Sequence, residues 1–176
     1  VEDLGWMGHY ETVVAYDDAS QLIWVYDSYL GNGPDGFGQV HTYADFEYWW
    51  SHFNRTFLVI FPIEREADLR VVLGNYASTQ YAAEQALNMA LQNAQLNATD
   101  HWAWFNAGSS EAKLGQIAWN GGDTAAARTH YNNAAYYFDE AFRLGMPHRV
   151  TWYQFGAFEA YYYTGRYQDV IALADR

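Results

Sequence analysis

Residues 8–17, GHYETVVAYD, and residues 23–29, IWVYDSY, decide the fold of the first part of this chain. Aromatic and β-branched residues recur at every second position of the first stretch, which is typical of a β-strand. Short polar residues at 17–20 separate the two stretches and favour a turn, because such side chains bond to their own backbone. The sequence therefore predicts a β-hairpin here.

His9 and Asp27 are the candidate catalytic residues of this hairpin. His9 opens the first strand and Asp27 closes the second, so the two lie 27 − 9 = 18 residues apart and can face each other at the open end. A carboxylate bound to one imidazole nitrogen fixes the tautomer, so that the other nitrogen can take a proton from a nucleophile. Spacing alone favours the other interpretation, a solvated or structural His–Asp pair, because most such pairs at strand ends have no catalytic role.

The rest of the first part is predicted to be a loop, a short strand, a helix and a last strand. The loop is the glycine-rich segment 31–38, because four glycines and a proline cannot continue a regular element. The short strand spans 40–43, and the helix spans 44–53 with aromatic residues at helical spacing. The segment 55–61, RTFLVIF, is apolar throughout its second half and is predicted to be a central strand that ends at Pro62.

The sequence changes in character after Glu64-Arg65-Glu66, where it becomes rich in Ala, Gln and Asn with a 3.6-residue period. We therefore predict a first domain over residues 1–63 and an all-α domain over 64–176. Thr79 and Asp123 are predicted helix N-caps, and Gly145 is a predicted helix end. The expected helices span 67–77, 79–96, 100–119, 123–144, 148–164 and 167–175.

An internal repeat appears in the helical part. Ala134 and Phe138 recur as Val170 and Ala174, 36 residues later, which is close to the period of tetratricopeptide repeats. The segment 164–174, TGRYQDVIALA, resembles the turn and second helix of such a unit. The sequence thus indicates a degenerate tetratricopeptide-like array, with an ordinary antiparallel helical bundle as the alternative.

Composition and charge restrict the function. The net charge is −12, which argues against nucleic acid and anionic membranes as partners. The chain has no cysteine, so disulfides and a thiol nucleophile within it are excluded. We expect no membrane-spanning segment. The chain starts at Val1 without an initiator Met, so we expect it to be a piece of a longer polypeptide. An export signal could precede it in that polypeptide. The compartment is therefore unknown, and an exported or cell-surface location is slightly favoured over the cytoplasm.

Four segments together resemble the C-terminal half of a C39-like cysteine peptidase domain. They are GHYETVVAYDD, IWVYDSYLG, TYADFEYWW and TFLVIFP, and the resemblance covers about residues 5–62. Tyr43, Phe46 and Trp50 match the family's helix pattern, and Pro62 matches the end of its last strand. Ser28 departs from the family, in which Pro is common at this position. The resemblance implies a papain-like α+β fold.

The resemblance also implies an activity. His9 would be the general base of a peptidase that hydrolyses peptide bonds, and Asp27 would orient it. In the family, the nucleophilic Cys and the oxyanion-hole Gln precede the His, and nothing in this chain occupies those places. The chain by itself is therefore expected to be inactive. The alternative is a non-catalytic protein–protein interaction module with a vestigial His–Asp pair.

The sequence thus predicts an α+β protein, with the antiparallel sheet half of a papain-like domain followed by a tetratricopeptide-like array. The expected partners are a peptide or protein substrate, a protein bound by the helical repeats, and an N-terminal fragment or second copy that covers the sheet. We expect no cofactor. His9 and Glu11 on one strand face could ligate a metal, but no third ligand is evident at a suitable spacing, so no metal is expected either.

Overall fold

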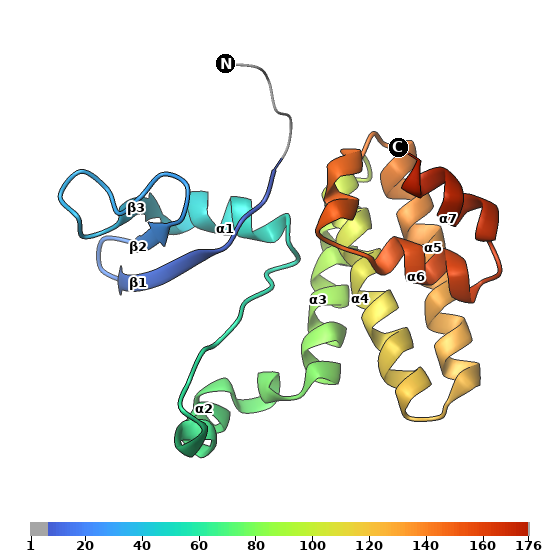
Figure 1. The fold of residues 1–176 in the computed structure, drawn as a ribbon, viewed down its shortest axis with the longest axis horizontal. Coiled ribbons are helices and arrows are strands. Elements are labelled where there is room, and N and C mark those ends of the chain that lie inside the picture. The colour runs from blue at the N-terminus through green and yellow to red at the C-terminus, as the bar shows by residue number, and fades with distance from the viewer. Residues whose placement is uncertain (1–6, 176) are drawn as a thin grey trace. The chain divides into compact units, whose positions relative to one another are not determined.

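The computed structural model describes residues 7–175 and divides the chain into two compact units, Val1–Thr56 and Phe57–Arg176. Figure 1 shows both units. An antiparallel sheet lies in the first unit and most of the helices lie in the second. This mixed content agrees with the predicted α+β class.

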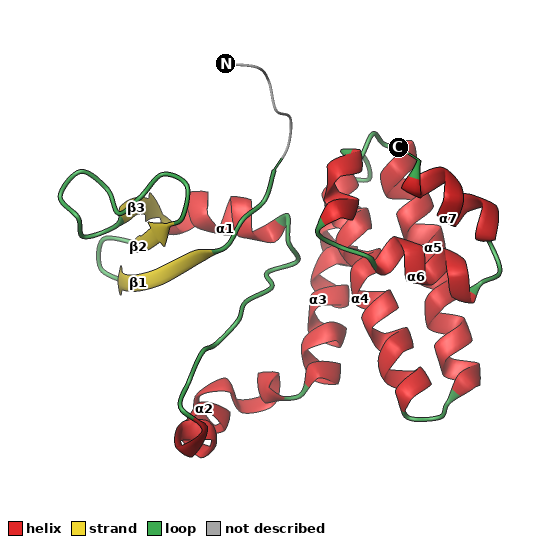
Figure 2. Ribbon diagram, in the orientation of Figure 1, coloured by secondary structure: helices red, strands yellow, loops and turns green. Residues whose placement is uncertain are grey.

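The first unit is built on the predicted hairpin. β1 (Glu11–Asp17) pairs antiparallel with β2 (Leu22–Asp27), which pairs antiparallel with β3 (Gln39–Thr42), as Figure 2 shows. The turn between β1 and β2 forms as its composition predicts. The Asp17 carboxylate accepts hydrogen bonds from the backbone N–H of Ala19 and the hydroxyl of Ser20, which close the turn through a side chain.

A single α-helix, α1 (Tyr43–Ser51), follows β3 and contacts both β2 and β3. It begins at Thr42, whose hydroxyl oxygen accepts a hydrogen bond from the backbone N–H of Asp45. Val25 of β2 is fully buried. The predicted aromatic face of the helix is only partly covered, since Trp49 is 60% exposed. The unit therefore has a small core centred on β2.

The predicted central strand at 55–61 is wrong. Residues 56–62 have no regular secondary structure, and Leu58 and Ile60 are among the most exposed apolar residues of the described chain. An apolar segment becomes a strand only when neighbouring strands supply hydrogen bonds and cover its side chains. The sheet of the described residues consists of β1, β2 and β3, so this segment has no strand partner among them.

The second unit is helical. Helix α4 packs between α3 and α5, helix α6 contacts α4 and α5, and helix α7 contacts α6. Within the described residues, every helix is too short or too polar to cross a membrane. The elements are η1 (Ile63–Arg65), α2 (Glu66–Leu73), η2 (Gly74–Ala77), α3 (Thr79–Leu96), α4 (His101–Asn120), α5 (Thr124–Arg143), η3 (His148–Trp152), α6 (Gly156–Tyr163) and α7 (Tyr167–Ala174).

Two predicted helices are interrupted. The helix predicted at 67–77 ends at Leu73, because Gly74 adopts a φ of 54° that a continuing helix cannot accommodate. The helix predicted at 148–164 is a 3₁₀ turn followed by α6, and the Thr151 hydroxyl donates to the carbonyl of His148 within that turn.

The predicted helix signals are largely confirmed. Asp123 caps α5 by accepting a hydrogen bond from the backbone N–H of Ala126, and Gly145 follows the end of α5 with a φ of 92°. The cap of α3 is Ser78 and not Thr79, because the Ser78 hydroxyl oxygen accepts the hydrogen bond from Tyr81.

The helical core lies where α4, α5 and α6 meet. Phe138 and Phe105 are fully buried and their ring centroids are 5.0 Å apart. A Cβ at Gly108 would lie 2.8 Å from the Phe138 ring, so this glycine lets α4 approach α5 closely. Of the predicted repeat positions, Ala134 and Phe138 are fully buried, whereas Ala174 of α7 is exposed.

Candidate active site

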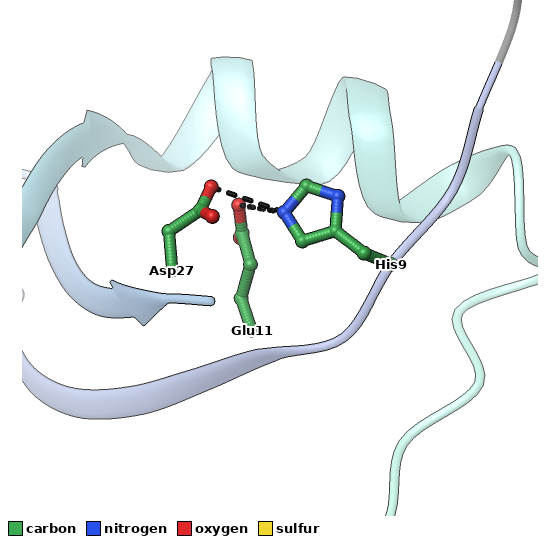
Figure 3. A group of neighbouring side chains, drawn as sticks. All are labelled: His9, Glu11 and Asp27. Carbon is green, nitrogen blue, oxygen red and sulfur yellow. Dashed lines mark hydrogen bonds and ion pairs between the residues drawn. The ribbon is translucent and has the colours of Figure 1, made fainter. Parts of the chain in front are cut away.

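The sheet brings His9 and Asp27 together, as Figure 3 shows. Glu11, and not His9, is the residue directly opposite Asp27 across the β1–β2 pair. His9 precedes Glu11 by two positions, so its side chain lies on the same side of the extended chain. Its Nε2 atom is 3.0 Å from Asp27 Oδ2. The arrangement is thus a hydrogen-bonded imidazole–carboxylate pair at the open end of a hairpin.

Asp27 is rigidly held. Its side chain is only 3% exposed, and its Oδ1 atom accepts hydrogen bonds from the backbone N–H groups of Tyr29 and Leu30, at 2.6 and 2.8 Å. Burial by itself would raise the pKa of Asp27, but the backbone bonds from Leu30 and Tyr29, together with His9, lower that pKa to about 2. The carboxylate is therefore charged near neutral pH.

Glu11 is a second carboxylate beside the same imidazole. Its Oε1 atom lies 3.7 Å from His9 Nε2, beyond hydrogen-bond distance. Burial raises the pKa of Glu11, His41 opposes this shift, and the Asp27 carboxylate adds to it. In the sequence, Glu11 follows His9 by two positions and Asp27 follows it by 18, so spacing does not show that all three lie together. The strand register unites the three side chains.

Gly8 fixes where His9 lies. A Cβ added at position 8 would overlap with the ring of Phe53, which follows α1. This close approach gives the Gly-His dipeptide a structural reason: the residue before His9 has no room for a side chain. The main chain that carries His9 is thereby packed against the end of the helical segment of its own unit.

We expect Gly8→Ala to destabilise the first unit by about 1–3 kcal/mol, because an overpacked contact must shift main chain or ring. Amide hydrogen exchange of β1 and β2 measures this effect, and exchange should accelerate. Adding Phe53→Ala to Gly8→Ala removes the overlapping ring and should restore part of the protection. Equal exchange in Gly8→Ala and the unmodified protein would show that this contact does not position His9.

A second imidazole–carboxylate pair lies in the helical unit. His130 Nδ1 of α5 is 2.6 Å from Glu111 Oε2 of α4, and Asn133 donates to the other Glu111 oxygen at 3.1 Å. The Glu111 side chain is 6% exposed. In the sequence, only the three-residue spacing of His130 and Asn133, which places them on one helix face, indicates that both could bind the same carboxylate. His130 and Asn133 each form a hydrogen bond with one oxygen of the buried Glu111 carboxylate. Buried polar groups need such partners, so we assign a structural role to this pair.

The helical unit also carries an open aromatic hollow of about 450 Å³. The rings of Tyr131 and Tyr163 stack at 4.5 Å, and Trp119 lies 5.1 Å from Tyr163. Arg128 adds a positive charge to the lining. Trp119 and Tyr163 are exposed, whereas Tyr131 is buried beneath them. Aromatic residues and Arg are enriched at protein–protein interfaces.

The described residues define a small antiparallel sheet with a His–carboxylate cluster and a unit of packed helices. Comparisons with family models, curated proteins and solved structures find no match to this chain. The sequence contains no cysteine, so any thiol chemistry at His9 requires a residue from outside these 176 positions.

Proposed function

We propose that the first unit supplies the His–Asp pair of a C39-like cysteine peptidase, whose nucleophilic thiol comes from polypeptide outside this chain. His9 is the general base and Asp27 orients it. One observation carries the proposal: the buried carboxylate of Asp27, held by two backbone N–H groups, lies 3.0 Å from His9 Nε2. Solvated surface pairs lack such a fixed carboxylate, since water satisfies their oxygens.

The chemistry follows from the two ring nitrogens. Asp27 holds the proton of His9 on Nε2, which leaves the Nδ1 lone pair to take a proton from a thiol. No hydrogen bond to Nδ1 occurs within residues 7–175, and the His9 side chain is 42% exposed. The thiolate attacks the peptide carbonyl, and the imidazolium then returns its proton to the leaving amine. Water completes the hydrolysis of the acyl-enzyme.

The helical unit would bind the substrate or a protein partner as a tetratricopeptide-like array. The aromatic hollow around Trp119 and Tyr163 supports this role. The exposed apolar residues of the first unit support a further partner, an N-terminal fragment or a second copy, over the sheet. These residues include Tyr10, Val13 and Tyr16.

Alkylation tests the proposal. The chain alone should not cleave a mixed peptide library, because it has no thiol. The same chain together with its natural flanking polypeptide should cleave peptides, and iodoacetamide should abolish cleavage while adding one alkyl group in intact-mass analysis. Cleavage that survives alkylation would overturn the cysteine mechanism.

A non-catalytic interaction module is the second candidate, favoured by the same aromatic hollow. It predicts no peptide cleavage by the longer polypeptide under any condition. It also predicts that a partner captured by the helical unit dissociates when Trp119→Ala removes one wall of the hollow. Tyr76→Ala is the matched control, because Tyr76 is an exposed aromatic outside the hollow.

A further inference from the structure

His9, Glu11 and Asp27 form a cluster of three possible metal ligands. The proposed His–Asp pair gives no role to the third of them, Glu11. Each residue offers one ligand atom, and the three atoms lie within 4.8 Å of one another. Figure 3 shows both carboxylates pointing at the same imidazole nitrogen. Nε2 carries at most one hydrogen. It can therefore donate a hydrogen bond to Asp27 Oδ2 at 3.0 Å, but it cannot also donate one to Glu11 Oε1 at 3.7 Å.

We propose that His9 Nε2, Glu11 Oε1 and Asp27 Oδ2 form a binding site for a divalent transition-metal ion such as Zn²⁺. An ion at the centre of the group would accept a bond from all three atoms at once. A divalent ion would also neutralise the negative charges of the Glu11 and Asp27 carboxylates, whereas one imidazole carries at most a single positive charge. Nothing in the proposed peptidase mechanism uses Glu11.

The distances fit a zinc ion. Ligand atoms about 2.0–2.2 Å from a tetrahedral Zn²⁺ lie about 3.4 Å from each other. The two separations from Nε2, 3.0 and 3.7 Å, lie on either side of that value. The separation of the two carboxylate oxygens is within 4.8 Å, so rotation of the Glu11 side chain would bring the three atoms to the spacing of zinc ligands. The exposed edge of His9 leaves room for a water molecule as the fourth ligand.

The surroundings of the ligands favour the same ion. The two backbone N–H groups on Asp27 Oδ1 orient that carboxylate and leave Oδ2 free to point at the site. An imidazole ligand selects zinc, cobalt or copper over calcium and magnesium, which prefer oxygen ligands only. Residues 1–62 hold nine acidic residues and one basic residue, and this charge attracts cations to the unit.

If His9 is the general base of the proposed peptidase, a metal ion bound to His9 would prevent it from acting as one. An ion bound to Nε2 requires the proton of the neutral imidazole to be on Nδ1, which removes the lone pair that would accept a proton from the thiol. Zinc and peptide hydrolysis would therefore exclude each other, so the metal would act as a reversible inhibitor of the peptidase.

Calorimetric titration of the 176-residue chain with ZnCl₂ tests the site without any need for activity. We expect one Zn²⁺ per chain, bound at least about 100-fold more tightly than Mg²⁺, and a visible Co²⁺ spectrum of four-coordinate type. Glu11→Gln should weaken zinc binding at least about tenfold. The matched control Glu64→Gln makes the same charge change at an exposed position and should leave the affinity unchanged.

Two outcomes would overturn the site: no binding above that of Mg²⁺, or equal affinities for Glu11→Gln and Glu64→Gln, which would indicate general attraction to an acidic surface. Circular dichroism of Glu11→Gln separates lost ligation from lost folding. If zinc binds but does not inhibit cleavage by the longer polypeptide, the metal site stands and the proposed role of His9 fails.

Discussion

In the proposed longer polypeptide that carries both this chain and a nucleophilic thiol, His9→Ala should lower kcat/KM for peptide hydrolysis by about 10²–10⁴-fold. This range is typical for the removal of a general base. The thiol would then lose its proton acceptor and the imidazolium that stabilises the thiolate. Hydrolysis of a fluorogenic peptide measures the rate, and the rate of iodoacetamide alkylation near pH 6 should fall in parallel.

The matched control for this prediction is His130→Ala. His130 also pairs with a buried carboxylate, Glu111, but both residues belong to helices of the second unit and not to the unit that carries His9 and Asp27. Its removal should leave alkylation at pH 6 unchanged. Wild-type cleavage by His9→Ala would refute the assignment of His9 as the base.

Asp27→Asn shows whether Asp27 orients the imidazole of His9 or only stabilises the folded unit. An amide at position 27 keeps the shape of the side chain but can place a donor against Nε2, which favours the wrong imidazole tautomer. We expect a lower kcat with little change in KM, because substrate binding does not use Asp27. A circular dichroism spectrum equal to that of the unmodified protein should accompany this loss.

Phe138→Ala should destabilise the protein by about 3–5 kcal/mol, the usual cost of truncating a fully buried phenylalanine. Phe138 lies on α5, its ring contacts Phe105 of α4, and it lies directly against Gly108 and Gly156. Its removal would leave a cavity where three helices meet. Urea unfolding followed by far-ultraviolet circular dichroism measures the loss, since most of the helix belongs to this unit.

Tyr136→Ala on the same helix is the control, because Tyr136 is 57% exposed and its truncation should cost about 1 kcal/mol or less. If Phe138→Ala does not fold, Phe138→Leu keeps most of the volume and should show a smaller destabilisation in the same direction. Equal unfolding midpoints for Phe138→Leu, Tyr136→Ala and the unmodified protein would contradict the central place of Phe138.

Local sequence signals account for most of the elements. The alternation in GHYETVVAYD predicts β1, and the polar residues at 17–20 predict its turn. Asp123 and Gly145 mark the two ends of α5. Such signals work because turns and helix ends are stabilised by side chains that bond to nearby backbone groups.

The segment 55–61 shows where local signals fail. Its β-branched and aromatic residues favour a strand, yet a strand is completed only by hydrogen bonds to another strand that lies far away in sequence. No described strand supplies them. A local pattern can state that a segment is suited to a sheet, but it cannot state that a partner is present.

Turn signals, helix caps and residue periodicity along the chain were sufficient to predict the hairpin and the long helices α3, α4 and α5. The 18-residue separation of His9 and Asp27 was sufficient to predict that the two lie near the same end of the hairpin. The strand register in the folded unit was needed to show that Glu11 is the residue opposite Asp27 and that the side chains of His9, Glu11 and Asp27 lie together. Strand register depends on the balance of turn geometry and cross-strand contacts, and a shift by one residue would turn every side chain to the other face.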